Sequence, residues 1–304
     1  MKKLLMVIPL VILLCFTFGC QKQAEEVAET TKEEIQTETG FAEVNGTKLY
    51  YEIAGEGDPI VFIHGNGGDR RHWDDQFEVF AKSHKVIRYD VRGFGKSSTP
   101  VEGERYSFHD DLKALLEHLS ISKAHICGLS MGCGIAVDFA LAYPDMSSSL
   151  IAVGPWAFGY DSPAAGELWE IFGEIPSIIK ESGTKAAMDY WLDSPTFTKT
   201  IKDPRVSERL REIGYDYSFW NFLNQDPVIF VDPPAAQQLD KLSLPTLIIT
   251  AEYDLEACKE IADLMERKNP NAKKIIIADA GHCMNMEKPE EFNKAVLDFL
   301  KELE

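Results

Sequence analysis

Short apolar runs alternate with longer helical patterns along most of this chain of 304 residues. Six apolar runs are too short for helices, and we interpret them as buried strands. They span residues 60–63, 85–89, 124–127, 150–153, 247–250 and 274–277. Helices are predicted over residues 108–119, 132–143 and 290–303. Nearer the start, Asn45-Gly46 separates two strand-like segments, which predicts a β-hairpin.

Strands that alternate with helices predict an α/β fold, with a mostly parallel sheet covered by helices on both faces. Residues 156–240 interrupt this alternation. They lean towards helix and hold 14 of the 32 aromatic residues, including four of the five tryptophans. We therefore expect an α/β core over residues 41–155 and 241–304. A helical lid is expected over residues 156–240, with rings that form its core and line an apolar pocket.

The beginning of the chain has the pattern of a secretion signal. Lys2 and Lys3 precede an uncharged apolar run over residues 4–18, which is shorter than the roughly 20 residues of a membrane-spanning helix. The run ends in Gly19-Cys20, which resembles the site where bacterial lipoproteins are cleaved and lipidated, with Thr17 where Leu is usual. We expect residues 1–19 to be a signal peptide and Cys20 to carry lipid. An ordinary secretory signal and an uncleaved anchor are the alternatives.

Charge adds two expectations about location and partners. Residues 21–40 contain six Glu, two Lys and no aromatic residue, so residues 20–40 are expected to be a lipidated Cys20 followed by a disordered acidic tether. The net charge of the chain is −18, which disfavours nucleic acid and anionic membrane surfaces as partners. We therefore expect an extracytoplasmic protein that is held at the bacterial membrane by the Cys20 lipid alone.

Four cysteines remain beyond Cys20, and outside the cytosol they could pair. They are Cys127, Cys133, Cys258 and Cys283. No C-x-x-C unit is present, so we expect no zinc site, and no other metal or organic cofactor is implied.

The five residues from Gly128 to Gly132 have the pattern G-x-S-x-G, with Ser130 at the centre. The motif follows a predicted strand and opens a predicted helix, where it forms a tight turn that exposes the serine. We interpret Ser130 as a nucleophile, and a structural helix cap is the alternative.

A serine hydroxyl needs a base, and the base needs an acid that orients it. His282 follows the last predicted strand, in a loop that can reach Ser130, whereas the other histidines lie at predicted surface or packing positions or in the Gly-rich loop below. Asp254 follows the preceding strand and is the expected acid, with Glu252 and Asp279 as alternatives.

An oxyanion needs backbone N–H donors. Met131 follows the nucleophile at the beginning of a helix and supplies one. The loop His64-Gly65-Asn66-Gly67-Gly68 follows a predicted strand, and Asn66 is the expected second donor, with Gly67 as the alternative.

Together these motifs resemble the α/β-hydrolase family over about residues 42–304. Residues 90–97, DVRGFGKS, are similar to a D-x-R-G-x-G-x-S segment of the family, which we read as a structural loop beside the active site. The order Ser130, Asp254, His282 is the family order. The resemblance implies a lid-bearing serine hydrolase that cleaves an ester of a small to medium apolar compound through an acyl-enzyme.

Several other functions are compatible with the same residues. The family is diverse, so the motifs indicate the mechanism better than the substrate. A lactonase, a thioesterase, a carbon–carbon bond hydrolase and an acyltransferase would use the same triad. A ligand-binding protein that signals without turnover is the alternative from another class.

Overall fold

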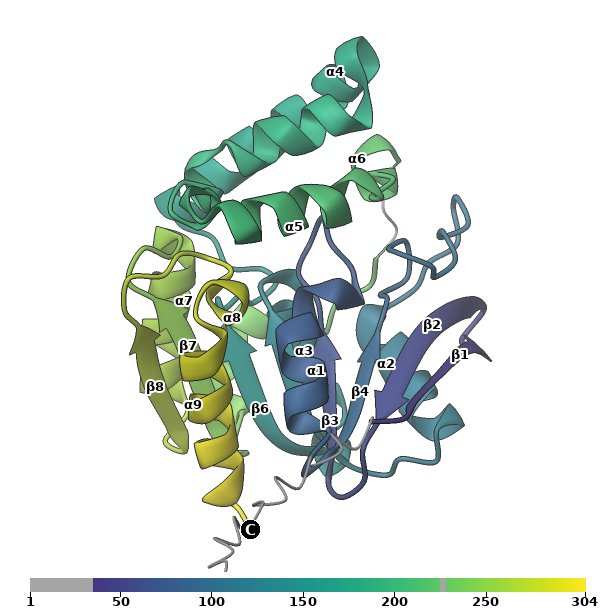
Figure 1. Cartoon of the computed structure of the whole chain (residues 1–304), viewed down its shortest axis with the longest axis vertical. Helices are drawn as coiled ribbons and strands as arrows, with labels where there is room; N and C mark the ends of the chain where they lie inside the picture. The colour runs from purple at the N-terminus through teal and green to yellow at the C-terminus, as the bar shows by residue number, and fades with distance from the viewer. Residues whose placement is uncertain (1–34, 225–227) are drawn as a thin grey trace, which may run out of the picture. The chain divides into compact units, whose positions relative to one another are not determined.

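One eight-stranded sheet runs through the computed structural model, which describes residues 35–224 and 228–304 (Figure 1). The strand order is β1-β2-β4-β3-β5-β6-β7-β8. The strands are β1 (Thr37–Val44), β2 (Thr47–Ala54), β3 (Pro59–Ile63), β4 (Lys85–Tyr89), β5 (Ala124–Leu129), β6 (Ser147–Val153), β7 (Thr246–Ala251) and β8 (Ala272–Ile277). Only the pairs β1–β2 and β2–β4 are antiparallel. The predicted mostly parallel sheet is thus confirmed.

The predicted hairpin joins β1 and β2. Its turn residues Asn45 and Gly46 have φ of 47° and 69°, the positive values that a two-residue hairpin turn requires. β1 begins earlier than expected, because residues 37–40 pair with residues 51–54 of β2. The prediction of a disordered tether was therefore wrong for residues 37–40. The polar side chains of Thr37, Glu38 and Thr39 suit an exposed edge strand. The expected signal peptide, Cys20 and residues 21–34 lie outside the described residues.

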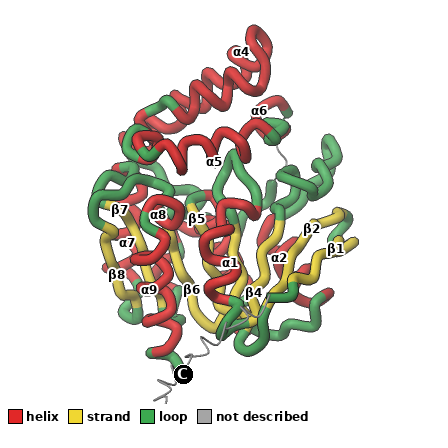
Figure 2. Tube along the Cα trace, viewed as in Figure 1, coloured by secondary structure: helices red, strands yellow, loops and turns green. Residues whose placement is uncertain are grey.

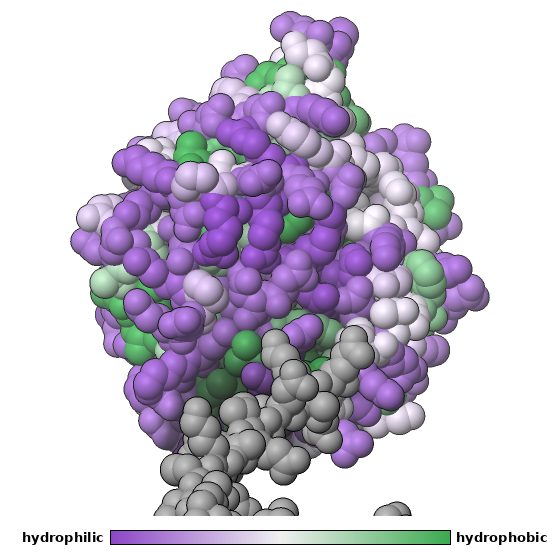
Figure 3. Space-filling view, in the orientation of Figure 1, coloured by the Kyte–Doolittle hydropathy of each residue, from purple (hydrophilic) through white to green (hydrophobic). Residues whose placement is uncertain are grey.

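Helices cover both faces of the sheet (Figure 2). On one face, α1 (Asp74–Phe80) and α9 (Pro289–Lys301) bury Phe77 and Phe292 against Ile60 and Phe62 of β3. On the other face, α2 (Phe108–His118), α3 (Met131–Ala142) and α7 (Glu256–Lys268) share a core with the alternate residues of β3. The outer surface on the side of α1 and α9 is mostly polar (Figure 3). Because both faces of the sheet are buried under helices, the central strands are almost wholly apolar.

The stretch between β6 and β7 is helical, and we call residues 156–240 the insertion. It contains α4 (Pro163–Leu192), α5 (Pro204–Tyr215), α6 (Trp220–Leu223) and short 3-10 turns. α4 begins at the Ser162 cap and bends at Gly183, whose φ is 86°. Its buried side chains, among them Trp191, belong to the same apolar core as α3. Among the described helices, none combines the length and the apolar character needed to cross a bilayer.

Candidate active site

Ser130 stands on the sharp turn between β5 and α3. Its backbone has φ 55° and ψ −115°, which is rare for a residue with a side chain. The turn needs glycine on both sides, since a Cβ on Gly128 would lie 2.1 Å from the Gly132 carbonyl oxygen and one on Gly132 would lie 2.3 Å from that of Ile63. The Ser130 N–H donates to the Val153 carbonyl oxygen over 2.9 Å. The turn therefore holds the Ser130 side chain at the carboxyl end of β5.

His282 and Asp254 lie in the loops that follow β8 and β7. The distance from His282 Nδ1 to Asp254 Oδ1 is 2.7 Å, and both side chains are buried. The backbone N–H of Leu255 donates to Asp254 Oδ1 over 2.8 Å, and the Thr250 hydroxyl donates to Oδ2 over 3.1 Å. With the His282 Nδ1–H donating to the carboxylate, Nε2 is left as the basic nitrogen of the ring.

The two alternative acids are engaged elsewhere. Asp279 is exposed and forms ion pairs with Lys199 and Lys288. Glu252 is also exposed, and its carboxylate accepts the backbone N–H of Asp279 over 2.9 Å. The geometry therefore favours Asp254, and neither Glu252 nor Asp279, as the acid that orients His282.

Ser130 and His282 line the same cavity, which has a volume of about 520 Å³. The strand-end loops form one wall and the insertion forms the other. Half of the insertion residues in this wall are aromatic, namely Trp156, Phe158, Trp169, Phe172, Trp191, Phe197, Phe222 and Phe230. The Phe197 ring meets the His282 ring edge to face at 5.9 Å between centroids. On the opposite side, a Cβ on Gly154 would lie 3.0 Å from His282 Cε1, so this glycine makes room for the imidazole.

The Gly-rich loop after β3 passes directly beside Ser130. A Cβ on Gly65 would lie 3.6 Å from the Ser130 Cβ. The Gly67 N–H donates to the Asn66 side-chain oxygen over 3.0 Å, so the alternative donor is already engaged. Met131 is the first residue of α3, where N–H groups precede the hydrogen-bond ladder of the helix. Asn66 and Met131 both line the cavity, so their backbone N–H groups are the candidate donors of an oxyanion site.

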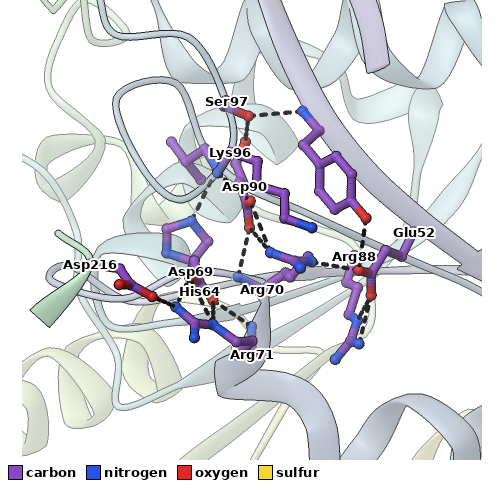
Figure 4. Close-up of polar contacts among 12 residues, drawn as sticks. Glu52, His64, Asp69, Arg70, Arg71, Arg88, Asp90, Lys96, Ser97 and Asp216 are labelled. Atoms are coloured by element: carbon purple, nitrogen blue, oxygen red, sulfur yellow. Dashed lines mark hydrogen bonds and ion pairs between the residues drawn. The ribbon is translucent and has the colours of Figure 1, made fainter. Parts of the chain in front are cut away.

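A buried polar network around His64 and Asp90 holds the Gly-rich loop in place (Figure 4). His64 Nε2 accepts the backbone N–H of Val91 over 3.0 Å, and Nδ1 lies 2.9 Å from the Gly65 carbonyl oxygen. The imidazole is thus a neutral Nδ1–H tautomer, and its complete burial lowers the pKa of His64. His64 is therefore a structural link between the Gly-rich loop and the segment 90–97.

Asp90 is the centre of the same network. It accepts the backbone N–H groups of Arg70 at 3.0 Å and Lys96 at 2.8 Å, and the Arg70 guanidinium lies 3.1 Å from its Oδ2. Arg70 also reaches Glu52 at 2.6 Å, and Arg88 contacts the other oxygen of Glu52 at 2.6 Å. Burial opposes ionisation of Glu52, but the two guanidinium groups outweigh it and hold the pKa of Glu52 below its usual value.

Within the described residues, one trio could supply metal ligands. Ligand atoms of Asp254, Cys258 and His282 lie within 4.8 Å of one another, and all three residues are buried. Their side-chain types suit zinc. His282 Nδ1 and Asp254 Oδ1 are already joined by a hydrogen bond of 2.7 Å. We therefore interpret these two residues as a hydrogen-bonded pair and not as metal ligands.

The four cysteines expected in the exported chain are free thiols and are buried. Burial raises the pKa of Cys133 to about 12 and raises the pKa of Cys283 as well. Burial raises the pKa of Cys127 and Cys258 too, so all four are protonated thiols in the apolar core, and only Cys283 lines the cavity among the described residues. The pairing that the sequence left open is not formed among them.

Comparison with known proteins agrees with this geometry. Residues 58–289 match the alpha/beta hydrolase fold family. The chain belongs to the alpha/beta hydrolase fold family. The family match spans the Ser130 turn, the insertion and both strand-end loops that carry Asp254 and His282.

Three known proteins show what this chain is similar to. A 2-hydroxy-6-oxononadienedioate/2-hydroxy-6-oxononatrienedioate hydrolase from Burkholderia vietnamiensis is 28% identical over 84% of this chain and 93% of its own length. The enol-lactonase from Burkholderia xenovorans LB400 is 27% identical, with a TM-score of 0.73 over 86% of this chain and 100% of its own. A thermophilic esterase from Thermogutta terrifontis is 26% identical, with a TM-score of 0.71 over 88% and 99%. The relatives thus support a hydrolase.

His72 occupies a packing position, as one of the two expected readings had it, but its place in the cavity wall was not expected. The side chain is buried and lines the cavity. A Cβ on Gly68 would lie 2.1 Å from the His72 ring, so the Gly-rich loop packs directly on it. Burial, reinforced by His64, lowers the pKa of His72 to about 3 and keeps the ring neutral. No motif marks this residue, because its place depends on how the loop turns.

Proposed function

We propose that this protein is a serine hydrolase that cleaves a carboxylic ester of a small to medium apolar compound. The observation that carries the proposal is the shared cavity: Ser130 and His282 line it, and His282 is bonded to the buried Asp254. The esterase and the enol-lactonase that resemble this chain support an acyl substrate. Apolar and aromatic side chains dominate the wall around Ser130, which suits an apolar acyl or alcohol group.

The reaction follows from the roles of these three residues. Ser130 Oγ forms a bond to the ester carbonyl carbon while His282 Nε2 takes the hydroxyl proton, and Asp254 stabilises the resulting imidazolium. The tetrahedral intermediate collapses, the C–O bond to the alcohol breaks, and His282 gives the proton to the leaving alkoxide. Water then attacks the acyl-enzyme with His282 as base, which releases the carboxylic acid and restores the Ser130 hydroxyl.

The N–H groups of Asn66 and Met131 stabilise the oxyanion in both steps. Each such donor is worth about 3 kcal/mol of transition-state stabilisation. The network around His64 and Asp90 keeps the Asn66 loop in place before substrate binds, so little reorganisation is needed during the reaction.

The insertion acts as a lid in this proposal. Trp191 packs on the Gly-rich loop, since a Cβ on Gly67 would lie 2.5 Å from its ring. The insertion therefore covers Ser130 from the side opposite the sheet and excludes water from the acyl-enzyme except for the attacking molecule.

The test is hydrolysis of p-nitrophenyl esters from acetate to laurate by the purified full chain. We expect Ser130→Ala to lower kcat/KM by at least about a thousandfold, because the nucleophile is lost. Ser98→Ala, at an exposed serine, is the matched control and should leave the rate unchanged. Equal rates in wild type and Ser130→Ala would overturn the proposal. A lactone and a carbon–carbon substrate belong in the same assay, because the enol-lactonase and the Burkholderia hydrolase resemble this chain.

We further propose that the protein is exported and anchored through lipid on Cys20. Support comes from the signal-like residues 1–19 and the following cysteine. Mass spectrometry of the membrane-extracted protein should find a lipid-modified Cys20 as the first residue. Cys20→Ala should abolish incorporation of labelled lipid into the protein, and an unmodified Cys20 in the wild type would refute the anchor.

A further inference from the structure

The described residues that line the cavity at Ser130 offer no counter-charge for an anionic substrate. Among the described residues that line it there is no lysine, arginine, aspartate or glutamate. Its polar side chains are the neutral Asn66, Asn221 and Thr196, together with Ser130 and two histidines. One of these, His72, is buried, and its burial lowers its pKa to about 3, so the ring is uncharged. The other, His282, donates to Asp254 and must be neutral to act as a base.

The basic side chains closest in sequence to the lining residues point into ion pairs elsewhere. Arg71, next to His72, lies 2.7 Å from both Asp69 and Asp216. Arg209, next to Leu210, lies 2.6 Å from Asp75 of α1. These arginines therefore hold the insertion to the core and are not available to a ligand.

Two more basic neighbours, Arg211 and Lys199, behave in the same way. Arg211, on the far side of Leu210, lies 2.9 Å from Asp193 and also contacts Asp189. Lys199, close to Phe197, pairs with Asp279. Each of these four cations is paired with an acid outside the cavity. The net charge of −18 adds a general repulsion of anions.

We infer that the site takes esters whose buried part carries no free carboxylate, with an aromatic or alicyclic group held among the rings of the insertion. A carboxylate moved from water into this cavity would lose its hydration without gaining an ion pair, which is strongly unfavourable. The inference rests on the proposed ester hydrolysis and narrows it. The resembling hydrolase from Burkholderia vietnamiensis differs here, since its name specifies dioate substrates.

The test compares two esters that differ by one charge, p-nitrophenyl methyl adipate and p-nitrophenyl hydrogen adipate. We expect the full wild-type chain to release p-nitrophenol from the methyl-capped ester with kcat/KM at least about a hundredfold higher, because only the other ester buries an unpaired charge. Values within threefold of each other would overturn the inference while leaving ester hydrolysis intact. No Ser130-dependent release from either ester would instead overturn the proposed function.

A binding measurement decides the inference even without turnover. Trp156, Trp169 and Trp191 line the cavity, so quenching of tryptophan fluorescence reports occupancy. In full-length Ser130→Ala, the methyl-capped ester should bind at least tenfold more tightly than the acid. Equal affinities would overturn the inference.

A charge introduced into the wall gives the converse test. Leu168 lines the cavity on α4 and is half-buried, so a lysine there can reach the ligand while staying partly hydrated. Leu168→Lys should shift the ratio of the two kcat/KM values towards the acid by at least tenfold, and the neutral control Leu168→Met should not. An equal shift in both variants would show that wall shape and not charge sets the preference, and would overturn the inference.

Discussion

Gly65 and Gly132 both lie next to Ser130, but their lack of a side chain serves different ends. A Cβ on Gly132 would lie 2.3 Å from the Ile63 carbonyl oxygen, so the turn cannot close over any larger residue. A Cβ on Gly65 would lie 3.4 Å from the Leu129 carbonyl oxygen, which is an ordinary contact. The same atom would lie 3.6 Å from the Ser130 Cβ, where the substrate carbonyl must approach. Gly132 is therefore needed for folding and Gly65 for access.

This difference predicts opposite behaviour for two alanine variants. Gly65→Ala should unfold within about 1 kcal/mol of the wild type, yet lose about ten- to a hundredfold in kcat/KM because its methyl group displaces the substrate. Gly132→Ala should lose about 2 kcal/mol or more of unfolding free energy, since backbone must move to admit the methyl group. Urea unfolding and ester kinetics on both variants test this. A fully active Gly65→Ala would contradict the assignment.

At the scale of elements, Glu287 at the end of α8 (Met284–Glu287) joins the insertion to the loop that carries His282. One carboxylate oxygen accepts the Gly281 N–H over 2.8 Å, and the other accepts the hydroxyl of the buried Thr200 over 2.6 Å. Gly281 directly precedes His282. The Glu287 carboxylate therefore holds the loop that carries His282 and the insertion in place together. We assign Glu287 as a positioning residue.

Glu287→Ala should lower kcat about tenfold with little change in KM, because the contacts to both the Gly281 N–H and the Thr200 hydroxyl are lost. The loss of unfolding free energy should be about 1 kcal/mol. Asp279→Asn is the matched control: it weakens the exposed pairs with Lys199 and Lys288 in the same loop and should change neither value much. A variant that loses stability but keeps the wild-type kcat would reduce Glu287 to a structural role.

The elements that the sequence predicts well are those with a local signal. Residues 85–89 form a strand with the predicted bounds, and Asn45-Gly46 forms the predicted turn. The beginning of β1 was missed because residues 37–40 are as polar as the tether before them, and only pairing with β2 makes them a strand. Propensity cannot show a contact of that kind.

The candidate site divides in the same way. Ser130, Asp254 and His282 follow from a motif and from their positions after strands, and the structure brings them to one cavity edge. His72 and the absence of cations from the wall could not be predicted. Both depend on which side of a loop or helix faces inwards, and on distant acids such as Asp75 that draw arginines away.

At the scale of the whole molecule, one buried acid makes folding depend on pH. Asp138 on α3 is 2% exposed, and its Oδ2 accepts the Val231 N–H over 3.4 Å where the chain returns from the insertion. His109 Nδ1 lies 3.8 Å from the same oxygen, but burial lowers the pKa of His109 and disfavours its charged form. Burial raises the pKa of Asp138 to about 7, against an ordinary value of 3.8. This carboxyl is thus held largely without a counter-charge.

Asp138 should therefore make the protein less stable as the pH rises. Between pH 4 and 7 the folded state binds a proton here that the unfolded state has released, so its stabilising contribution is full below 3.8 and is lost as the pH rises through about 7. Asp138→Asn keeps the shape and an acceptor for Val231 but cannot ionise. By urea unfolding, the variant's stability relative to the wild type should increase by about 3 kcal/mol between pH 5 and pH 8, and most of the increase should come below pH 7. The exposed Asp145→Asn is the control for the change in net charge and should show no such increase. A relative stability that falls between pH 5 and pH 8 would mean that the charged form of Asp138 stabilises the return of the insertion to the core.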